Sequence, residues 1–274
     1  MFKIIIMALL IFIGMVGYDN ITDKAQPTTP VQQEQQKISK HEKSAAMALF
    51  TSLLPPKEEW PSPVHKFYLA FNMDEVIDPI RQNPNWTSLD AMSRDIPQAL
   101  IAIEDHAFYN HGAIAVEGIL RAALANINAG EVVQGGSTLT QQFVKNIFLS
   151  HEQSMERKIE EAVLSLMLED NYSKDEILEL YLNTTYFGAG STGIRQASKT
   201  YFGKAPSALT LAEAAVIASL PYAPTGLNPL ANPEGCKKRQ LLVLAAMHKY
   251  GMINQGQLAE AKAEKIRLTN GTVM

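Results

Sequence analysis

Two adjacent acids and two histidines follow an apolar helical stretch in the segment IEDHAFYNH, residues 103–111. Glu104 and Asp105 would stand at the carboxyl end of that helix, where negative charge opposes the helix dipole, so local stability does not explain them. A carboxylate placed there could act as a general acid or base, although a solvated helix face would explain Glu104 alone. His106 and His111 are five residues apart and do not share a helix face, which argues against a histidine-based metal site.

A second segment, QGGSTLTQQFVKN at residues 134–146, combines a glycine pair with a helical pattern. Ser137 is expected to cap the helix, and Thr138, Gln142 and Lys145 recur at i, i+4 and i+7 on one face. A hydroxyl, an amide and an ammonium on one face would suit a sugar and its phosphate. The alternative is an ordinary amphipathic helix with a wet side, and the phosphate-loop pattern GxxxxGK[ST] is absent.

The third segment, MERKIEEAVLSLML at residues 155–168, becomes apolar nearly all round after Glu161, which is typical of a buried helix. The Glu161 carboxylate is therefore expected to enter a low-dielectric environment and to need partners. Arg157 and Lys158 stand four and three residues before it, within reach on the same helix. A purely structural buried ion pair would produce the same pattern.

The elements that must position these residues are mostly helices. Two capping boxes, at Ser173 with Glu176 and at Thr210 with Glu213, each precede apolar residues at helical spacing. Residues 65–73 are the best candidate for a strand. Further helices are predicted at residues 93–104, 115–129, 138–149, 155–170, 193–201, 236–250 and 254–264.

Composition favours a packed domain and excludes some classes of protein. Of the 274 residues 46% are hydrophobic, enough for a substantial core. The 24 basic and 28 acidic residues give a net charge of −4, so no bulk basic field exists to hold nucleic acid. Cys236 is the single cysteine, which excludes an intrachain disulfide and cysteine-based metal clusters.

The chain is expected to have three parts. Residues 4–18 form an uninterrupted apolar run behind Lys3, with no recognisable cleavage site, so residues 1–19 are predicted to be an uncleaved transmembrane signal anchor. Residues 20–63, rich in polar side chains at their start, are predicted to be a flexible tether. Residues 64–270 are predicted to form the folded domain, on the extracytoplasmic side by the positive-inside bias.

Taken together, the motifs resemble glycosyltransferase family 51, the peptidoglycan glycosyltransferases. This domain occurs alone in monofunctional biosynthetic transglycosylases and as the amino-terminal half of class A penicillin-binding proteins. The resemblance spans about residues 96–252 and rests on five segments in order: EDHAFYNH, GGSTLTQQFVKN, RKIEEA, YSKDEILELYLNTTYFGAGSTGIRQASKTYFGK and LTLAEAAVIASLPYAPTGLNPLANP. GGSTLTQQ together with ED-x-x-F-x-x-H is highly specific.

The resemblance implies an enzyme that polymerises lipid II into β-1,4-linked glycan strands, with inversion at the anomeric carbon and release of undecaprenyl diphosphate. It implies that Glu104 is the general base on the acceptor hydroxyl and that Glu161 is a second catalytic glutamate near the donor. The remaining substrate-binding positions that it implies are Asp105, Phe108, His111, Thr138, Gln142, Lys145, Arg157 and Lys158. No metal-binding residue is assigned, although Mg²⁺ or Mn²⁺ could assist the diphosphate, as in some members of this family.

The implied fold is mostly α: a lysozyme-like helical lobe with a smaller, mobile lobe near the membrane, preceded by the transmembrane anchor. Residues between Ala113 and Gly136 are expected to contribute to the smaller lobe. The expected partners are lipid II, the growing glycan strand, the membrane and proteins of the cell-wall synthesis complex. The expected location is the bacterial cytoplasmic membrane, crossed once, with the catalytic domain outside. The transpeptidase motifs Ser-x-x-Lys and Lys-Thr-Gly are absent, so crosslinking is not expected.

Two departures from the family pattern leave the presumed catalytic groups untouched. Ala113 and Ala115 stand where the family often has glycine and aspartate, and Tyr222 interrupts a Pro-Asn-Ala-Pro motif. Two other function classes stay open. A lysozyme-like enzyme could use Glu104 as a general acid to cleave glycan, and a non-catalytic scaffold could serve the wall-synthesis complex.

Overall fold

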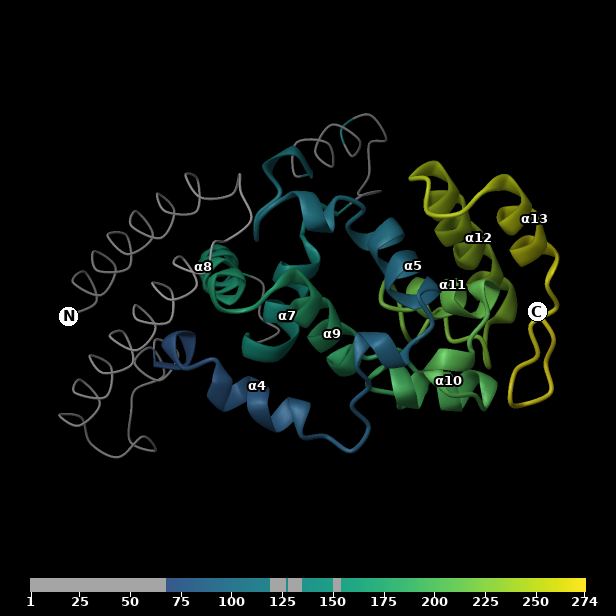
Figure 1. Cartoon of the computed structure of the whole chain (residues 1–274), viewed down its shortest axis with the longest axis horizontal. Helices are drawn as coiled ribbons and strands as arrows, with labels where there is room; N and C mark the ends of the chain where they lie inside the picture. Colours follow the sequence, from purple (N-terminus) through teal and green to yellow (C-terminus); the bar gives the residue numbers. More distant parts are fainter. Residues whose placement is uncertain (1–67, 119–126, 128–134, 150–153) are drawn as a thin grey trace. The chain divides into compact units, whose positions relative to one another are not determined.

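The computed structural model describes residues 68–118, 127, 135–149 and 154–274. The chain divides into two compact units, residues 1–76 and 77–274, and the functional segments all lie in the second. The described residues are mostly helical, as predicted, and the only β-structure among them is two isolated antiparallel bridges, Tyr186 with Thr192 and Arg267 with Val273 (Figure 1).

The helices keep the labels of Figure 1, and η marks a short 3-10 helix. They are α4 (Asp74–Arg81), η2 (Leu89–Ala91), α5 (Asp95–Glu104), η3 (Phe108–Asn110), α7 (Leu139–Phe148), α8 (Met155–Asn171), α9 (Lys174–Thr184), α10 (Ile194–Phe202), η4 (Pro206–Ala208), α11 (Leu211–Ser219), α12 (Pro233–Lys249) and α13 (Gln255–Ala263).

The strand prediction for residues 65–73 is wrong in the part that the structure describes. Residues 68–71 are helical, and the Asn72 amide closes the turn by donating to the Tyr68 carbonyl at 3.0 Å. The segment has no β-branched residue, while Leu69, Ala70 and Met73 have high helix propensity, so a short run of alternation was not enough to specify a strand.

Helix starts agree closely with the predicted caps. Both capping boxes form, because Ser173 accepts from the Glu176 amide and Thr210 accepts from the Glu213 amide. The cap of α7 is one residue later than predicted: Thr138, not Ser137, accepts from the Gln141 backbone amide, and the Gln141 side-chain oxygen accepts from the Thr138 backbone amide. A hydroxyl at either position could cap, and sequence alone did not distinguish them.

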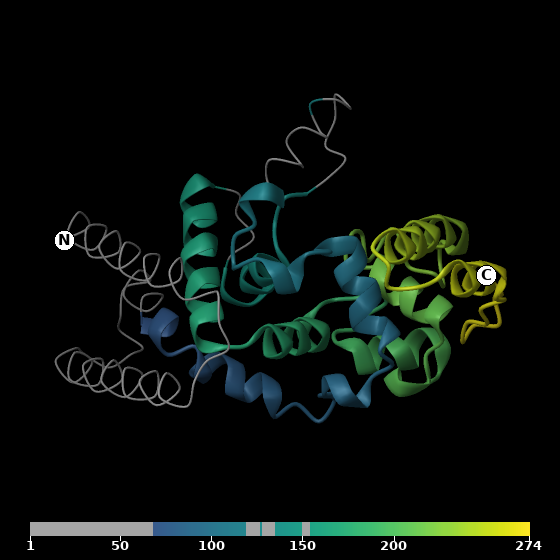
Figure 2. The same cartoon turned by 45° about the horizontal axis from the view of Figure 1, so that its top comes forward.

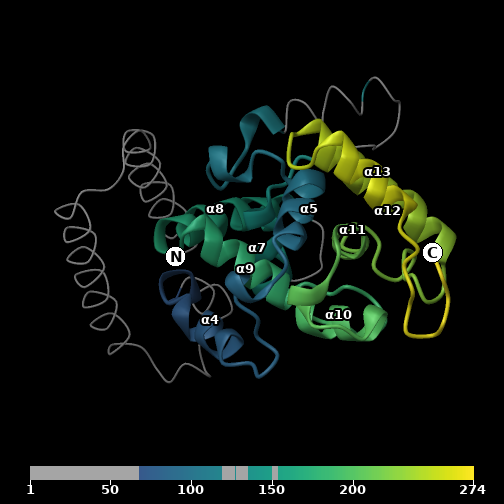
Figure 3. The same cartoon turned by 45° about the vertical axis from the view of Figure 1, so that its right-hand side comes forward.

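Helix α11 is the centre of the core that supports α5 and α12. Its own side chains are small or branched and are buried on all faces of the helix, among them Ala214, Ala215, Val216 and Ile217. It makes its most extensive contacts with α5 and α12, which lie beside it (Figure 1 and Figure 3). Small alanine side chains let helix axes approach closely, so the carboxyl end of α5 is held by a rigid neighbour.

A second packed group joins α7 to α8 and α9 (Figure 2). Leu139 and Phe143 on α7 are fully buried, as are Leu168 on α8 and Leu178 on α9. Fully burying an aliphatic or aromatic side chain contributes roughly 1.5–3 kcal/mol each. The polar residues of α7 are therefore carried on a helix whose orientation is fixed from two sides.

Several expectations fall outside the described residues. The predicted anchor at 1–19 and the tether at 20–63 lie there, as do most of the helix predicted at 115–129 and of the proposed smaller lobe. Residues 116–118 and 127 are helical, in agreement with that helix. Among the residues that the structure describes, no helix is both long and apolar enough to cross a membrane.

Candidate active site

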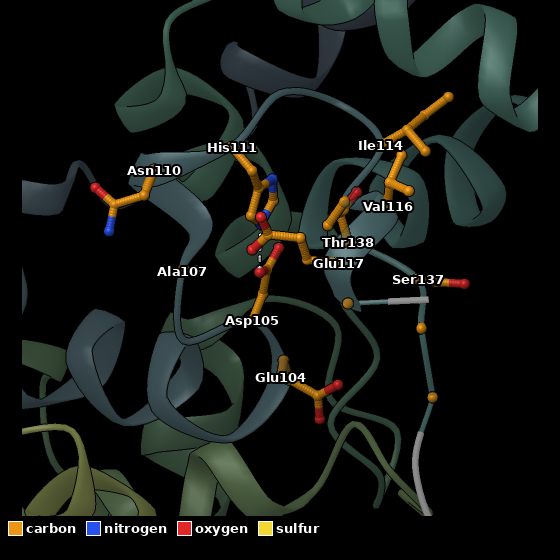
Figure 4. A pocket seen from close by; sticks show the side chains of 14 residues that line it. Glu104, Asp105, Ala107, Asn110, His111, Ile114, Val116, Glu117, Ser137 and Thr138 are labelled. Carbon is orange, nitrogen blue, oxygen red and sulfur yellow. Dashed lines mark hydrogen bonds and ion pairs between the residues drawn. The ribbon is translucent and has the colours of Figure 1, made fainter. Parts of the chain in front are cut away.

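Glu104 lies at the last position of α5 and lines a cavity of about 360 Å³ (Figure 4). The cavity wall comes from the residues after α5 and from the segment that enters α7. Its lining residues are Glu104, Asp105, Ala107, Asn110, His111, Ile114, Ala115, Val116, Glu117, Gly118, Gly135, Gly136, Ser137 and Thr138. The first two sequence motifs, residues 103–111 and 134–146, therefore meet around one space.

The Glu104 carboxylate is held by an amide from α7. Gln142 Nε2 donates to Glu104 Oε2 at 3.1 Å, and the hydroxyl of Tyr181 on α9 donates to Gln142 Oε1 at 3.0 Å. Sequence reasoning placed Gln142 on the substrate face, and the structure brings it directly to the presumed base. The contact between Tyr181 and Gln142 was not predicted from the sequence.

Burial raises the pKa of Glu104 above its usual range, although its Gln142 hydrogen bond and the positive charges of Arg239 and Lys145 lower it. A desolvated carboxylate that keeps one donor is a stronger proton acceptor than an exposed one. Arg239 lies on α12, with its guanidinium 4.2 Å from the ring centre of Tyr222. Sequence reasoning missed Arg239, because its charge reaches Glu104 only through the packing of α12 against α5.

Asp105 joins the end of α5 to the start of α7. Its Oδ2 accepts from the Leu139 amide at 3.0 Å, and its Oδ1 lies 2.6 Å from His111 Nε2. The side chains of Asp105 and His111 point toward one another in Figure 4. A carboxylate at a helix amino terminus is favourable, so the charge that opposes the dipole of α5 stabilises α7 instead.

His111 is held at both ring nitrogens. Nδ1 lies 2.6 Å from the Gly112 carbonyl oxygen, and Nε2 faces Asp105. Burial alone would lower the pKa of His111, but the hydrogen bonds to Asp105 and to the Gly112 carbonyl outweigh it, and the net pKa is raised. Both nitrogens therefore act as donors when the ring is protonated, and His111 supports the loop that forms the cavity wall.

Two other predicted substrate-binding residues are largely enclosed by protein. Thr138 is buried, and its hydroxyl donates to the Ala113 carbonyl at 2.8 Å while it caps α7. Phe108 is fully buried, with the Lys174 ammonium 4.3 Å from its ring centre. Thr138 lines the cavity, whereas Phe108 does not.

Lys145, also predicted to bind substrate, is exposed and lies one turn beyond Gln142 on α7.

Glu161 forms the predicted ion pairs on α8. It is 1% exposed, contacts the Lys158 ammonium, and lies 3.5 Å from Arg157 Nη1. Lys158 also donates to Ser137 Oγ at 3.2 Å, and Ser137 lines the cavity. Through this contact, the group of Glu161, Arg157 and Lys158 is connected to the wall of the cavity that Glu104 lines.

The fourth motif supplies supports for the site. Glu179 accepts from the Trp86 indole at 3.2 Å and the Leu89 amide at 2.7 Å, while Asn183 bonds the backbone of Thr87 in both directions at 2.8 Å. These contacts join α9 to the segment before α5.

The described residues show no candidate metal site, because no three acidic, histidine or cysteine side chains among them lie together as a possible ligand set.

Comparison with known proteins identifies the family. The family model described as Transglycosylase matches residues 73–248. The chain is 41% identical over 194 residues to "Putative transglycosylase H16_A0665" of Cupriavidus necator, covering 71% of this chain and 84% of that protein. It is 44% identical over 185 residues to penicillin-binding protein 1A of Neisseria flavescens, covering 68% of this chain and 23% of that protein.

A third relative is penicillin-binding protein 1A of Aquifex aeolicus, 44% identical over 176 residues, covering 64% of this chain and 24% of that protein. The chain thus spans about a quarter of the length of these penicillin-binding proteins. A crystal structure of penicillin-binding protein 1A from Haemophilus influenzae aligns with a TM-score of 0.34 and 33% identity, over 48% of this chain and 16% of that one. The family match confirms the resemblance carried by the motifs, and the chain belongs to the transglycosylase family.

Proposed function

We propose that this protein is a peptidoglycan glycosyltransferase that polymerises lipid II into β-1,4-linked glycan. The observation that carries the proposal is the Glu104 carboxylate: it lines the cavity, keeps one amide donor, and lies in the field of two cations. Family membership supplies the reaction class, and the cavity supplies a place for a proton acceptor beside cationic groups.

In the proposed reaction Glu104 accepts the proton of the 4-hydroxyl of the acceptor GlcNAc. The acceptor oxygen attacks the anomeric carbon of the donor sugar from the face opposite the diphosphate. The bond from that carbon to the diphosphate oxygen breaks, and undecaprenyl diphosphate leaves with the electron pair. Attack opposite the leaving group inverts the configuration from α to β.

The departing diphosphate needs compensation of negative charge more than it needs a proton. Lys158, which contacts the cavity-lining Ser137, is proposed to supply it together with Arg157 and the exposed Lys145. Glu161 would hold the first two in place, since its buried carboxylate contacts both. No step is assigned to a metal ion, and a dependence on Mg²⁺ or Mn²⁺ is an outcome of the assay below.

The lipid substrate places the reaction at a membrane surface. We propose that residues 1–19 anchor the chain in the bacterial cytoplasmic membrane, with the catalytic domain on the extracytoplasmic side, where cell-wall synthesis proteins would be its neighbours. The apolar run behind Lys3 supports this arrangement. A cysteine-scanning label applied from outside intact cells would reach positions beyond residue 20 if the orientation is as proposed.

Incubation of purified protein with lipid II, and separately with preformed glycan, distinguishes the proposed polymerase from its rivals. We expect polymer from lipid II and no fragments from glycan, measured with and without Mg²⁺ or Mn²⁺. Fragments without polymer would establish a lysozyme-like hydrolase or lytic enzyme. Absence of both products under every condition, with a folded protein, would favour the scaffold.

A further inference from the structure

The Tyr181 hydroxyl is hydrogen-bonded to Gln142, the residue that contacts the Glu104 carboxylate. Tyr181 lies on α9, is 1% exposed, and is absent from the lining of the cavity. Its hydroxyl donates to Gln142 Oε1 on α7 at 3.0 Å, across the packed face between the two helices. Burial raises the pKa of Tyr181, and the charge of Glu104 raises it further, so the phenol stays protonated and remains a donor.

That hydroxyl and the Glu104 carboxylate together determine the orientation of the Gln142 amide: the carboxylate accepts from Nε2, and the hydroxyl donates to Oε1. The oxygen and the NH₂ group of an amide have nearly the same shape, so hydrogen-bond partners alone select the orientation. With Oε1 accepting from Tyr181, Nε2 points to the Glu104 carboxylate at 3.1 Å. The opposite orientation would set the amide oxygen against the carboxylate and repel the deprotonated form.

We infer that Tyr181 is a positioning residue for the proposed base: through Gln142 it fixes a donor on Glu104 and keeps that carboxylate ionised and aimed into the cavity. The inference rests on the proposed function, in which Glu104 accepts a proton. Tyr181 does not touch the substrate and acts only through the amide.

The balance of charge at Glu104 makes this donor important. Burial disfavours the ionised carboxylate, and Asp105 disfavours it further, while Gln142, Arg239 and Lys145 favour it. Among these groups, Gln142 acts through a hydrogen bond to the carboxylate, whereas Asp105, Arg239 and Lys145 act through their charge. Freeing the amide therefore shifts Glu104 toward its protonated form, in which it cannot serve as a base.

Replacement of Tyr181 by phenylalanine removes the hydroxyl and keeps the ring. For Tyr181→Phe we expect the acidic limb of the pH profile of kcat to move to higher pH. At pH values below the midpoint of that limb, turnover of lipid II should be reduced about three- to tenfold relative to wild type. The two enzymes should converge at alkaline pH, where Glu104 is ionised in both. KM should stay within about twofold, because the cavity is unchanged.

Tyr201→Phe is the matched control. Tyr201 is also fully buried, and its hydroxyl donates to the Phe187 carbonyl at 2.8 Å, away from Glu104. Both variants lose one buried hydrogen bond, so both should lose some thermal stability. Only Tyr181→Phe should move the pH profile.

A titration that needs no turnover separates this inference from the proposed function. In protein labelled with ¹³C at glutamate carboxyl carbons, the Glu104 resonance is assigned by its loss in Glu104→Gln. Its midpoint should lie at higher pH in Tyr181→Phe than in wild type, even if lipid II is not the substrate. An unchanged midpoint, or a loss of kcat that is equal at every pH and matched by Tyr201→Phe, would overturn the inference.

Discussion

Glu161→Gln offers a test in which stability and activity should separate. The Glu161 side chain is 2% exposed and contacts Lys158 and Arg157, whose side chains are 45% and 16% exposed. Glutamine keeps the size and one acceptor oxygen but removes the negative charge. The change leaves two cations close together without their counter-charge.

The two cations contribute unequally to the cost. Removing one member of a fully buried pair costs about 3–5 kcal/mol. Lys158 can turn into water, so most of the penalty falls on Arg157, whose Nε is already buried without a hydrogen-bond partner. We therefore expect a loss of about 2 kcal/mol in the free energy of unfolding, below that range because the amide still accepts a hydrogen bond. For a unit of this size the loss corresponds to a fall of about 4–8 °C in Tm.

Glu213→Gln is the matched control. Glu213 lies on α11, its side chain is only 3% exposed, and its carboxylate is 2.7 Å from the Lys204 ammonium. Neither residue lines the cavity. Thermal unfolding and lipid II polymerisation are measured for both variants at a temperature where both are folded. Both should lose stability, but only Glu161→Gln should lose turnover, by about 100-fold, as expected when the two cations proposed to stabilise the leaving group are no longer held in place.

Two results would refute this reasoning. Normal polymerisation by Glu161→Gln would show that the cluster of Glu161, Arg157 and Lys158 is only structural. Equal losses of activity in Glu161→Gln and Glu213→Gln would show that the assay reports general destabilisation.

Three further predictions concern substitutions of Asp105, Gly188 and Glu104. Asp105→Ala leaves the Leu139 amide without its acceptor and should cost about 1–3 kcal/mol by denaturant unfolding; an unchanged midpoint would contradict its capping role. Gly188→Ala would place a Cβ 2.2 Å from the Pro224 carbonyl oxygen at a φ of +87°, so the soluble yield and Tm should fall sharply; wild-type Tm would show that this turn relaxes freely. Glu104→Gln should raise the Tm at neutral pH and lose that gain at acid pH, because burial raises the pKa of Glu104 and makes the ionised form the costly one; a lower Tm at neutral pH would contradict this.

The sign of the last prediction follows from linkage. A carboxyl whose folded-state pKa is raised binds its proton more tightly when folded, so it favours the folded state while protonated. That contribution disappears as the pH rises through the folded-state pKa of Glu104. A neutral amide avoids the loss, and the difference between the two proteins should therefore grow with pH.

Local chemistry was readable from the sequence where partners are close in the chain. The pairing of Glu161 with Arg157 and Lys158 follows from helical spacing, and the boxes at Ser173 and Thr210 follow from a hydroxyl with a glutamate three residues later. The start of α7 was missed by one residue, since Ser137 and Thr138 are equivalent by type.

Side-chain contacts between segments far apart in the chain could not be predicted from the sequence. Asp105 caps α7 from 34 residues away, and Tyr181 reaches Gln142 across 39. Arg239 acts on Glu104 from a helix that packs on α5, and no local pattern near residue 239 indicates that position. Such partners depend on how helices pack, which periodicity does not specify, and the family resemblance gave roles to positions without giving these contacts.

The most direct test of the central claim is the rate of lipid II polymerisation by Glu104→Gln as a function of pH. Glu260→Gln, an exposed change on α13, is the control. We expect the control and wild type to show the same acidic limb, set by a carboxyl with a raised pKa, and Glu104→Gln to lose at least about 100-fold at pH values above that limb while remaining folded. Polymerisation by Glu104→Gln at the rate of the control would contradict the assignment of Glu104 as the base.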